Sequence, residues 1–96
     1  SQPDFMVISK GKAVMVECKG FRDTLKLKVD DIKVYDWWTQ FHPLSCFLYH
    51  VSTNEYFVVP YKTLRAVAVK CEVDRYHDNN KAYHKIPLDV VRSLRF

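Results

Sequence analysis

Two carboxylates and a lysine near the start of the chain have the types and spacing of a site for phosphate chemistry. Asp4 follows Pro3, and a single residue separates Glu17 from Lys19. Two hard carboxylate oxygens at one place suit Mg²⁺, which keeps waters and takes phosphate oxygens in its other positions. An ammonium group beside such a cation can orient a water or stabilise the charge that grows on phosphate. Asp4, Glu17 and Lys19 are therefore the candidate catalytic residues.

A predicted β-hairpin positions the two carboxylates. Two β-prone runs, residues 5–8 and 13–18, flank a turn at Lys10-Gly11, where glycine can take the positive φ of a tight turn. A two-residue turn fixes the register and sets Asp4 opposite Glu17. Directly opposed carboxylates repel, because their Cβ atoms are only about 5 Å apart. A bound divalent cation, a shared proton or solvent screening would each offset that repulsion.

Alternation of side chains along the strands gives the hairpin two faces. Asp4, Glu17 and Lys19 share one of them. The other face carries Cys18 and four apolar residues, Phe5, Val7, Val14 and Val16. We expect the Cys18 thiol to point into the core on that second face, which removes it as a candidate nucleophile.

The segment Pro3-Asp4, a hairpin-sized gap, and Glu17-Cys18-Lys19 together resemble the PD-(D/E)xK signature of the restriction-endonuclease-like nuclease superfamily. The sequence around them is most similar to small phage and archaeal Holliday-junction resolvases and related nuclease domains. The resemblance implies that Asp4 and Glu17 bind Mg²⁺, for which Mn²⁺ can substitute, and that the Cys18 backbone carbonyl adds a metal ligand. It also implies that Lys19 is the catalytic lysine and that the fold is a mixed β-sheet flanked by helices.

The chain departs from that superfamily at its start. Many members carry a helix ahead of the Pro-Asp strand that supplies a further acidic residue, whereas here only Ser1 and Gln2 precede the signature. Three explanations are open: the chain is a fragment, the helix comes from a larger parent protein or elsewhere, or the active site is incomplete.

The remaining periodicity predicts an α/β fold in one domain, residues 1–96. A basic connection over 21–28 leads to a helix from about Asp30, with Asp30 or Asp31 as its N-cap, and Pro43 stops it. The expected buried stripe of this helix is Ile32, Tyr35, Trp38 and Phe41.

Strands follow this helix. Residues 46–51 read as a strand buried on both faces, as at the centre of a helix-covered sheet. Residues 56–59 form a further strand that ends at Pro60, and Pro60 and Pro87 are each expected at the first position of a short helix. Residues 73–81 are polar, which indicates an exposed loop.

Basic residues concentrate in the first third of the chain, and the formal net charge is +4. They are Lys10, Lys12, Arg22, Lys26, Lys28 and Lys33. Next to a metal-binding carboxylate pair, such cations are expected to hold a nucleic-acid backbone, reading shape and not sequence. The preference for DNA over RNA is implied by the resemblance alone. A resolvase-like role further implies a homodimer, because a four-way junction presents two equivalent strands.

The number and spacing of the cysteines and the hydropathy of the chain indicate where in the cell the protein is expected to be. The three cysteines are odd in number and widely spaced, which is typical of a reducing, intracellular setting, so a cytoplasmic location is expected. No apolar run is long enough to span a bilayer, so no membrane partner is expected. Cys71, His77 and His84 lack the spacing of a zinc site.

Three hypotheses follow. The first is a Mg²⁺-dependent endonuclease that hydrolyses DNA phosphodiester bonds and selects branched structures. The alternative is a catalytically inactive nuclease-fold module that binds nucleic acid or a protein partner. A small structural or regulatory domain with no nucleic-acid role is the third.

Overall fold

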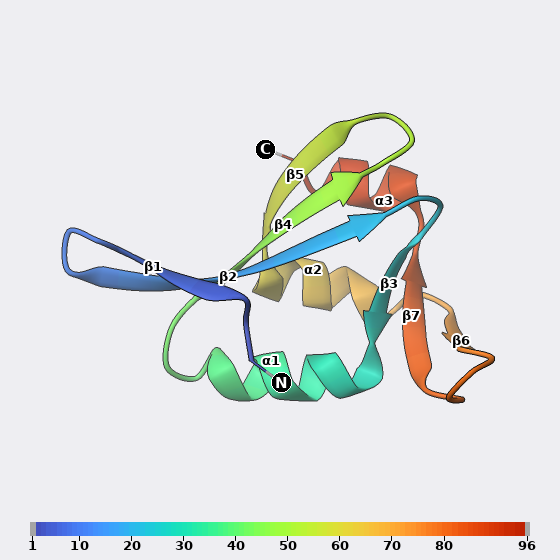
Figure 1. Cartoon of the computed structure of the whole chain (residues 1–96), viewed down its shortest axis with the longest axis horizontal. Coiled ribbons are helices and arrows are strands. Elements are labelled where there is room, and N and C mark those ends of the chain that lie inside the picture. Colours follow the sequence, from blue (N-terminus) through green and yellow to red (C-terminus); the bar gives the residue numbers. More distant parts are fainter. Residues whose placement is uncertain (1, 96) are drawn as a thin grey trace.

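The computed structural model, which describes residues 2–95, consists of runs of two or three strands that are each followed by one helix (Figure 1). The strands are β1 (Phe5–Ser9), β2 (Lys12–Phe21), β3 (Leu25–Lys28), β4 (Leu44–His50), β5 (Glu55–Pro60), β6 (Val73–Arg75) and β7 (Ala82–Ile86). The helices are α1 (Val29–Trp38), α2 (Tyr61–Ala68) and α3 (Leu88–Ser93). This arrangement confirms the predicted α/β class.

The described strands form two sheets. The first is a mixed four-stranded sheet in the order β1-β2-β4-β5, in which β2 and β4 run parallel and the outer pairs run antiparallel. The second is an antiparallel sheet in the order β3-β7-β6. Figure 1 shows the β1–β2 hairpin extending away from the rest of the molecule. With the hairpin included, the molecule measures 42 × 28 × 22 Å.

The predicted register of the β1–β2 hairpin is confirmed. Ser9 pairs with Lys12 and Met6 pairs with Met15. The two residues between the strands, Lys10 and Gly11, have φ angles of 51° and 75°. Positive φ at both central positions is the requirement of the type I′ turn that matches the twist of a hairpin. The local sequence therefore sets which residue of β2 meets Asp4.

Helices cover only one face of the four-stranded sheet. Figure 1 shows α1 and α2 on the same side of it, and the residues facing them, such as Met15, Leu48 and Val59, are buried. On the opposite face Phe47 and Val58 are 45% and 52% exposed. The prediction that residues 46–51 are buried on both faces is therefore wrong, because no described helix covers Phe47 and Val58 on the second face.

The same one-sided cover reverses the expected environment of Cys18. Cys18 is exposed, whereas the neighbouring Glu17 is buried. The prediction that the Cys18 thiol points into the core is therefore wrong. The division into two faces holds, since Cys18 pairs with Phe47 on the open face. The carboxylate face is the one that the helices cover.

Helix α1 begins at Val29, one residue before the predicted start at about Asp30, and the predicted N-cap at Asp30 or Asp31 is wrong. Its N-cap is Lys28, in an extended conformation, and Asp30 and Asp31 lie in the first turn. Carboxylates are favoured there by the helix dipole, so the two residues stabilise this end without capping it. Of the expected buried stripe Ile32 and Tyr35 are buried, Trp38 is partly buried and packs against the core, and Phe41 is 58% exposed beyond the helix end at Trp38.

Two segments predicted as connections contain short strands. Strand β3 lies within 21–28, where Leu25 and Leu27 are buried while Lys26 is exposed. Strand β6 lies within 73–81 and pairs with β7, so this exposed segment is a hairpin. The predicted strand over 56–59 and its end at Pro60 are confirmed by β5.

The short helices after the prolines are confirmed, with a small difference in position. Pro60 and Pro87 are the N-caps of α2 and α3, one residue before the predicted first helical position. Within residues 2–95, none of the helices has the length and apolar content needed to cross a bilayer.

Candidate active site

Asp4 and Glu17 meet as the register predicts, and each accepts a hydrogen bond from the backbone of the other strand. The Asp4 N–H donates to Glu17 Oε1 at 3.1 Å, and the Cys18 N–H donates to Asp4 Oδ2 at 2.8 Å. Each N–H places a partial positive charge against a carboxylate oxygen. Backbone donors therefore offset the mutual repulsion of the two carboxylates. This contribution adds to the three that the sequence left open, which are a bound cation, a shared proton and solvent screening.

Glu17 is the buried member of the pair. It is 8% exposed, and its Oε2 accepts a hydrogen bond of 2.7 Å from the Tyr35 hydroxyl. Burial is the main cause that raises the pKa of the Tyr35 hydroxyl well above its usual value. The hydrogen bond to Glu17 and the negative charge of Glu17 raise this pKa further. Tyr35 therefore stays protonated and donates to Glu17 at any physiological pH.

Lys19 is held between two carboxylates. Its Nζ lies 3.6 Å from Glu17 Oε2 and 3.7 Å from Asp31 Oδ2, and 5.9 Å from the centre of the Tyr35 ring. The Lys19 side chain keeps 22% of its surface exposed. The ammonium group is thus fixed in position and still open to solvent, as a group that meets a phosphate must be.

Asp31 and Tyr35 belong to this site, and the sequence reasoning assigned neither a role in it. They stand four residues apart on α1, so they lie on one face of the helix. The face of α1 that meets β2 depends on how the helix packs, which is not a local property of the sequence. The available signal was an acidic and an aromatic residue at helical spacing directly after the Glu-x-Lys strand.

A second layer of contacts fixes α1 in place. The Tyr61 hydroxyl, at the start of α2, donates to Asp36 Oδ1 at 2.8 Å and lies 3.2 Å from the Ile32 carbonyl. Arg65 Nε donates to the same Asp36 carboxylate at 2.8 Å. The Tyr35 and Tyr61 rings pack edge to face at 5.4 Å. Helix α2 therefore holds the helix that supplies Tyr35 and Asp31.

The donor set bears on the expected metal. Across residues 2–95, no group of three or more His, Cys, Asp or Glu side chains is arranged to hold a metal ion. Asp4 and Glu17 still offer two hard oxygen ligands, and Asp4 is exposed. Mg²⁺ sites commonly use one or two carboxylates and complete their coordination with waters and phosphate. The donor chemistry of the pair is that of a Mg²⁺ site, and both the metal itself and the metal-ligand role of the Cys18 carbonyl stay predictions.

The structure divides the basic residues predicted to bind nucleic acid. Arg22 and Lys26 line a cavity of about 640 Å³ together with Lys19. Lys28 lies close to that cavity, since its Nζ is 5.6 Å from the ring of Tyr76, which lines it. These cations lie beside the candidate catalytic lysine.

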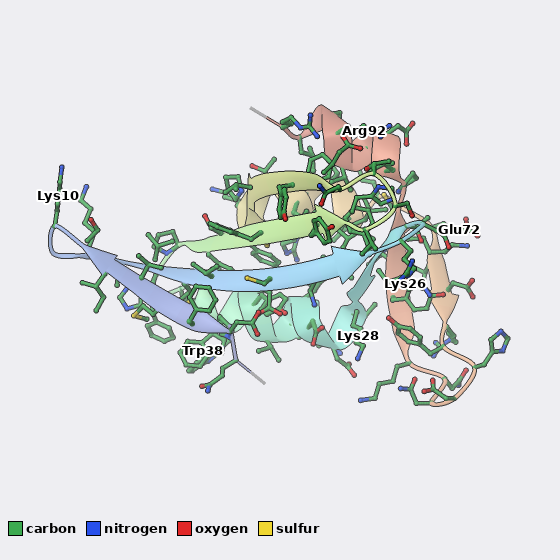
Figure 2. The ribbon with its side chains drawn as sticks, turned by 45° about the horizontal axis from the view of Figure 1, so that its top comes forward. Lys10, Lys26, Lys28, Trp38, Glu72 and Arg92 are labelled. Carbon is green, nitrogen blue, oxygen red and sulfur yellow. The ribbon has the colours of Figure 1, made fainter. Side chains whose placement is uncertain are left out.

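The other three basic residues lie elsewhere. Lys10 and Lys12 are at the tip of the β1–β2 hairpin, and Figure 2 shows Lys10 at the far end of the molecule from Lys26 and Lys28. Lys33 lines a separate hollow on α1 beside Trp37 and Trp38. The structure therefore does not bring these three residues together with Lys19.

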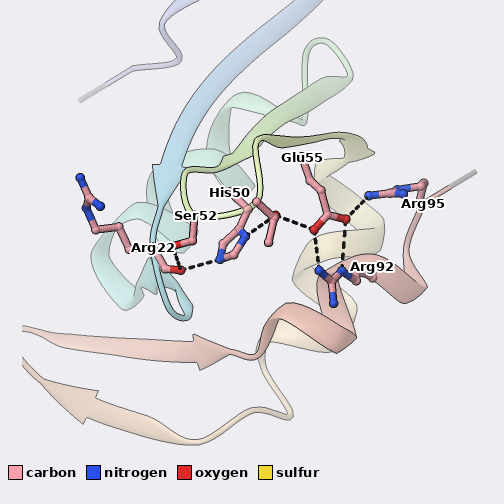
Figure 3. A network of polar contacts seen from close by, with 7 residues as sticks. Arg22, His50, Ser52, Glu55, Arg92 and Arg95 are labelled. Carbon is pink, nitrogen blue, oxygen red and sulfur yellow. Dashed lines mark hydrogen bonds and ion pairs between the residues drawn. The ribbon is translucent and has the colours of Figure 1, made fainter.

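A polar network supports the turn that carries Arg22. His50 Nε2 lies within hydrogen-bond distance of the Arg22 carbonyl, and the Ser52 hydroxyl donates weakly to the same carbonyl at 3.4 Å (Figure 3). Through Thr53 the network reaches Glu55, which also accepts hydrogen bonds from Arg92 and Arg95 near the chain end. The β4–β5 turn thereby connects α3 to one wall of the cavity.

Comparison of the chain with protein-family models, curated proteins and solved structures finds no match.

Proposed function

We propose that this chain is a Mg²⁺-dependent endonuclease that hydrolyses DNA phosphodiester bonds, with a preference for branched DNA. One observation carries the proposal: the Lys19 ammonium is fixed between Glu17, which also accepts a hydrogen bond from the Asp4 N–H, and Asp31, at the edge of a basic cavity. A structural ion pair alone would not need an exposed carboxylate and an open cavity at the same place.

The fold supports the finer assignment to a restriction-endonuclease-like core. Asp4 lies directly before β1, the Glu-x-Lys lies on β2, and β2 runs parallel to β4, which follows α1 in the chain. A mixed sheet with helices against it is what the PD-(D/E)xK resemblance implies. The arrangement agrees with that resemblance at the positions that carry the signature.

Each residue has a distinct task in this proposal. Asp4 and Glu17 would hold Mg²⁺, which when bound supplies Lewis acidity at the scissile phosphate. Tyr35 fixes the orientation of the Glu17 carboxylate through its hydroxyl. Lys19 holds a positive charge where negative charge develops on phosphorus-bound oxygens, and a preorganised charge of this kind lowers the barrier.

A second candidate function has one observation in its favour. Both Glu17 oxygens already accept hydrogen bonds from the protein, from the Asp4 N–H and the Tyr35 hydroxyl. A carboxylate satisfied in this way can be purely structural. The alternative is then a nuclease-fold module that binds nucleic acid or a protein partner without cutting.

Cleavage of an end-labelled substrate panel tests the proposal. The panel contains linear duplex, single strand, flap, four-way junction and RNA, each with Mg²⁺, Mn²⁺ or EDTA. We expect metal-dependent cutting of DNA, strongest on branched substrates, that is lost in Asp4→Asn. Paired symmetric nicks in the four-way junction would support a homodimer. Binding without cutting in any metal would contradict the proposal and favour the non-catalytic module.

A further inference from the structure

The cavity beside Lys19 is built from two separate parts of the chain. One wall is the end of β2 with the turn into β3, which contributes Arg22 and Asp23, and the start of β3, which contributes Lys26. The opposite contribution is Tyr76, the residue that follows β6. At about 640 Å³, the cavity falls within the range of roughly 300–1,000 Å³ typical of small-ligand sites.

The charged groups of the cavity are mostly cationic. Lys19, Arg22 and Lys26 line it, against one carboxylate, Asp23. Arg22 and Lys26 are exposed, so their charges are available to a ligand. Lys19 also belongs to the candidate active site, which makes the cavity continuous with that site.

Tyr76 sets an aromatic ring among these cations. Lys26 Nζ lies 5.4 Å from the centre of the Tyr76 ring and 5.2 Å from that of Tyr83. The two tyrosine rings are themselves 4.4 Å apart. Cationic groups and aromatic rings from neighbouring strands therefore form one mixed surface.

The β6–β7 hairpin that carries Tyr76 is held in place. The Tyr76 N–H donates to the Lys81 carbonyl at 3.1 Å, and the Asn80 N–H donates to the Tyr76 carbonyl at 2.9 Å. Lys81 Nζ lies 3.9 Å from Asp30 Oδ2 at the start of α1, which connects the hairpin to the helix of the candidate site. Tyr76 therefore has a defined position relative to Lys19.

We propose that this cavity binds an unpaired strand of DNA, with Arg22 and Lys26 on its phosphates and a base against Tyr76, and leads that strand to Lys19. The inference rests on the proposed nuclease function and adds the form in which the substrate enters. A positive groove combined with an aromatic ring is how proteins bind single strands, since every unpaired base offers a π-face. A duplex conceals those faces, because its bases are stacked on one another, so the aromatic ring favours an unpaired strand.

Fluorescence anisotropy in EDTA tests the inference without cleavage. The probes are a labelled 15-nucleotide dT strand, a strand of equal length made of abasic sites, and a 15-base-pair duplex. We expect dT to bind tightest. Tyr76→Ala and Tyr76→Leu should weaken dT binding by roughly 5- to 150-fold, the range for loss of one base stack, and leave the abasic strand unchanged. Tyr76→Phe should bind as the wild type does.

Replacing a cation should have a different effect. Lys26→Ala and Arg22→Ala should weaken binding of dT and of the abasic strand alike, and each should reduce the salt-dependence slope by about 0.7. Tyr56→Ala is the matched aromatic control, because Tyr56 is 71% exposed on the open sheet face. Lys62→Ala, on an exposed position of α2, is the matched cation control. Both controls should bind as the wild type does.

Two results would overturn the inference: duplex binding as tight as that of dT, or dT affinity unchanged in both Tyr76→Ala and Tyr76→Leu. The Leu variant keeps apolar bulk, so a folding defect confined to Tyr76→Ala does not decide the outcome. A wild type that cuts DNA while Tyr76 variants bind dT normally would reject this strand site alone. Tyr76-dependent dT binding by a protein that cuts nothing would reject the nuclease and keep the strand site.

Discussion

Glu17 is the residue on which the site depends most. It is buried, and it contacts the Asp4 backbone, the Tyr35 hydroxyl and the Lys19 ammonium. A buried carboxylate is tolerated only when hydrogen bonds and a countercharge replace its water. These contacts connect the residue before β1 with β2 and α1, so the groups that would meet substrate are fixed by the same contacts that stabilise the fold.

Removing the Tyr35 hydroxyl tests this dependence. Tyr35→Phe leaves one oxygen of the buried Glu17 without its hydroxyl donor, and we expect the free energy of unfolding to fall by about 1–3 kcal/mol. Tyr49→Phe is the matched control, because the Tyr49 hydroxyl donates to Asn54 at an exposed site and should cost little. Urea unfolding of both variants measures the difference. Equal midpoints for the two variants would show that the Tyr35 hydroxyl does not support Glu17.

Contacts that follow from the local sequence could be predicted, whereas contacts that depend on how helices and strands pack could not. Asp4 meets Glu17 because a two-residue turn and the alternation of a strand determine their register. Tyr35 and Asp31 reach Glu17 and Lys19 only through the placement of α1 against β2. Tyr76, which follows β6, approaches Lys26 only because β7 pairs with both β3 and β6. Neither placement has a local signature in the sequence.

The β1–β2 hairpin is the element that determines the register of the site. Its turn needs positive φ at Gly11, and a Cβ placed there would meet no atom within 4 Å. A side chain at position 11 would therefore lower the stability of the hairpin only through the backbone strain of a positive φ, and not through a steric clash.

Gly11→Ala should open the hairpin more often. A left-handed residue other than glycine costs about 1–2 kcal/mol, so the amides of β1 should exchange with solvent roughly 5- to 30-fold faster. Gly20→Ala serves as the control, since its Cβ would make only an ordinary contact of 4.0 Å with the Tyr49 carbonyl oxygen. Native-state hydrogen exchange measures both. Unchanged β1 exchange in Gly11→Ala would contradict the role of the turn.

The β4–β5 turn and α3 are joined at Glu55. Hydrogen bonds from Arg92 first, and then from Thr53 and Arg95, lower the pKa of Glu55 from 4.5 to about 2. A carboxylate whose pKa is lower in the folded state stabilises that state above its unfolded pKa, and the effect is lost as the pH falls toward the folded pKa.

A pH series on Glu55→Gln checks the sign of that effect. The wild type should have the higher Tm at pH 7, and the difference should shrink between pH 4.5 and pH 2 as Glu55 takes up its proton. Thermal unfolding followed by circular dichroism gives both Tm values. A difference that stays constant through this range would show that the Glu55 charge does not hold α3.

At the level of elements, segments marked by a turn or a proline were predicted, and the strands of four and three residues were not. The strand after the turn at residues 52–54 and the helices after Pro60 and Pro87 are confirmed. Strands β3 and β6 span four and three residues, too few for alternation to distinguish them from a connection. They form because β7 supplies their pairing partner.

In the whole molecule, the helices cover one face of the four-stranded sheet and leave Phe47 and Val58 exposed on the other. Strand β5 shows this in adjacent residues: Val59 is fully buried against the helices, while Val58 is 52% exposed on the open face. The sequence could not reveal this difference, because an apolar run has the same appearance whether one face or both are covered.

Two truncations one residue apart measure the asymmetry. Val59→Ala removes fully buried methyl groups and should cost about 2 kcal/mol or more, whereas Val58→Ala should cost about 1 kcal/mol or less. Urea unfolding of both variants gives the comparison. Equal losses would mean that the second face is also covered, for instance by self-association, and a concentration series would detect that.

The central claim is that Lys19 and its carboxylates cut phosphodiester bonds, and one comparison tests it most directly. Single-turnover cleavage of the preferred DNA in Mg²⁺ should be measured for the wild type, Lys19→Ala and Lys62→Ala, with circular dichroism showing that all three are folded. The account predicts wild-type rates for Lys62→Ala and a loss of at least about 100-fold for Lys19→Ala, the scale of one preorganised charge at a reacting group. A folded Lys19→Ala that cuts as fast as the wild type would contradict the assignment of this site.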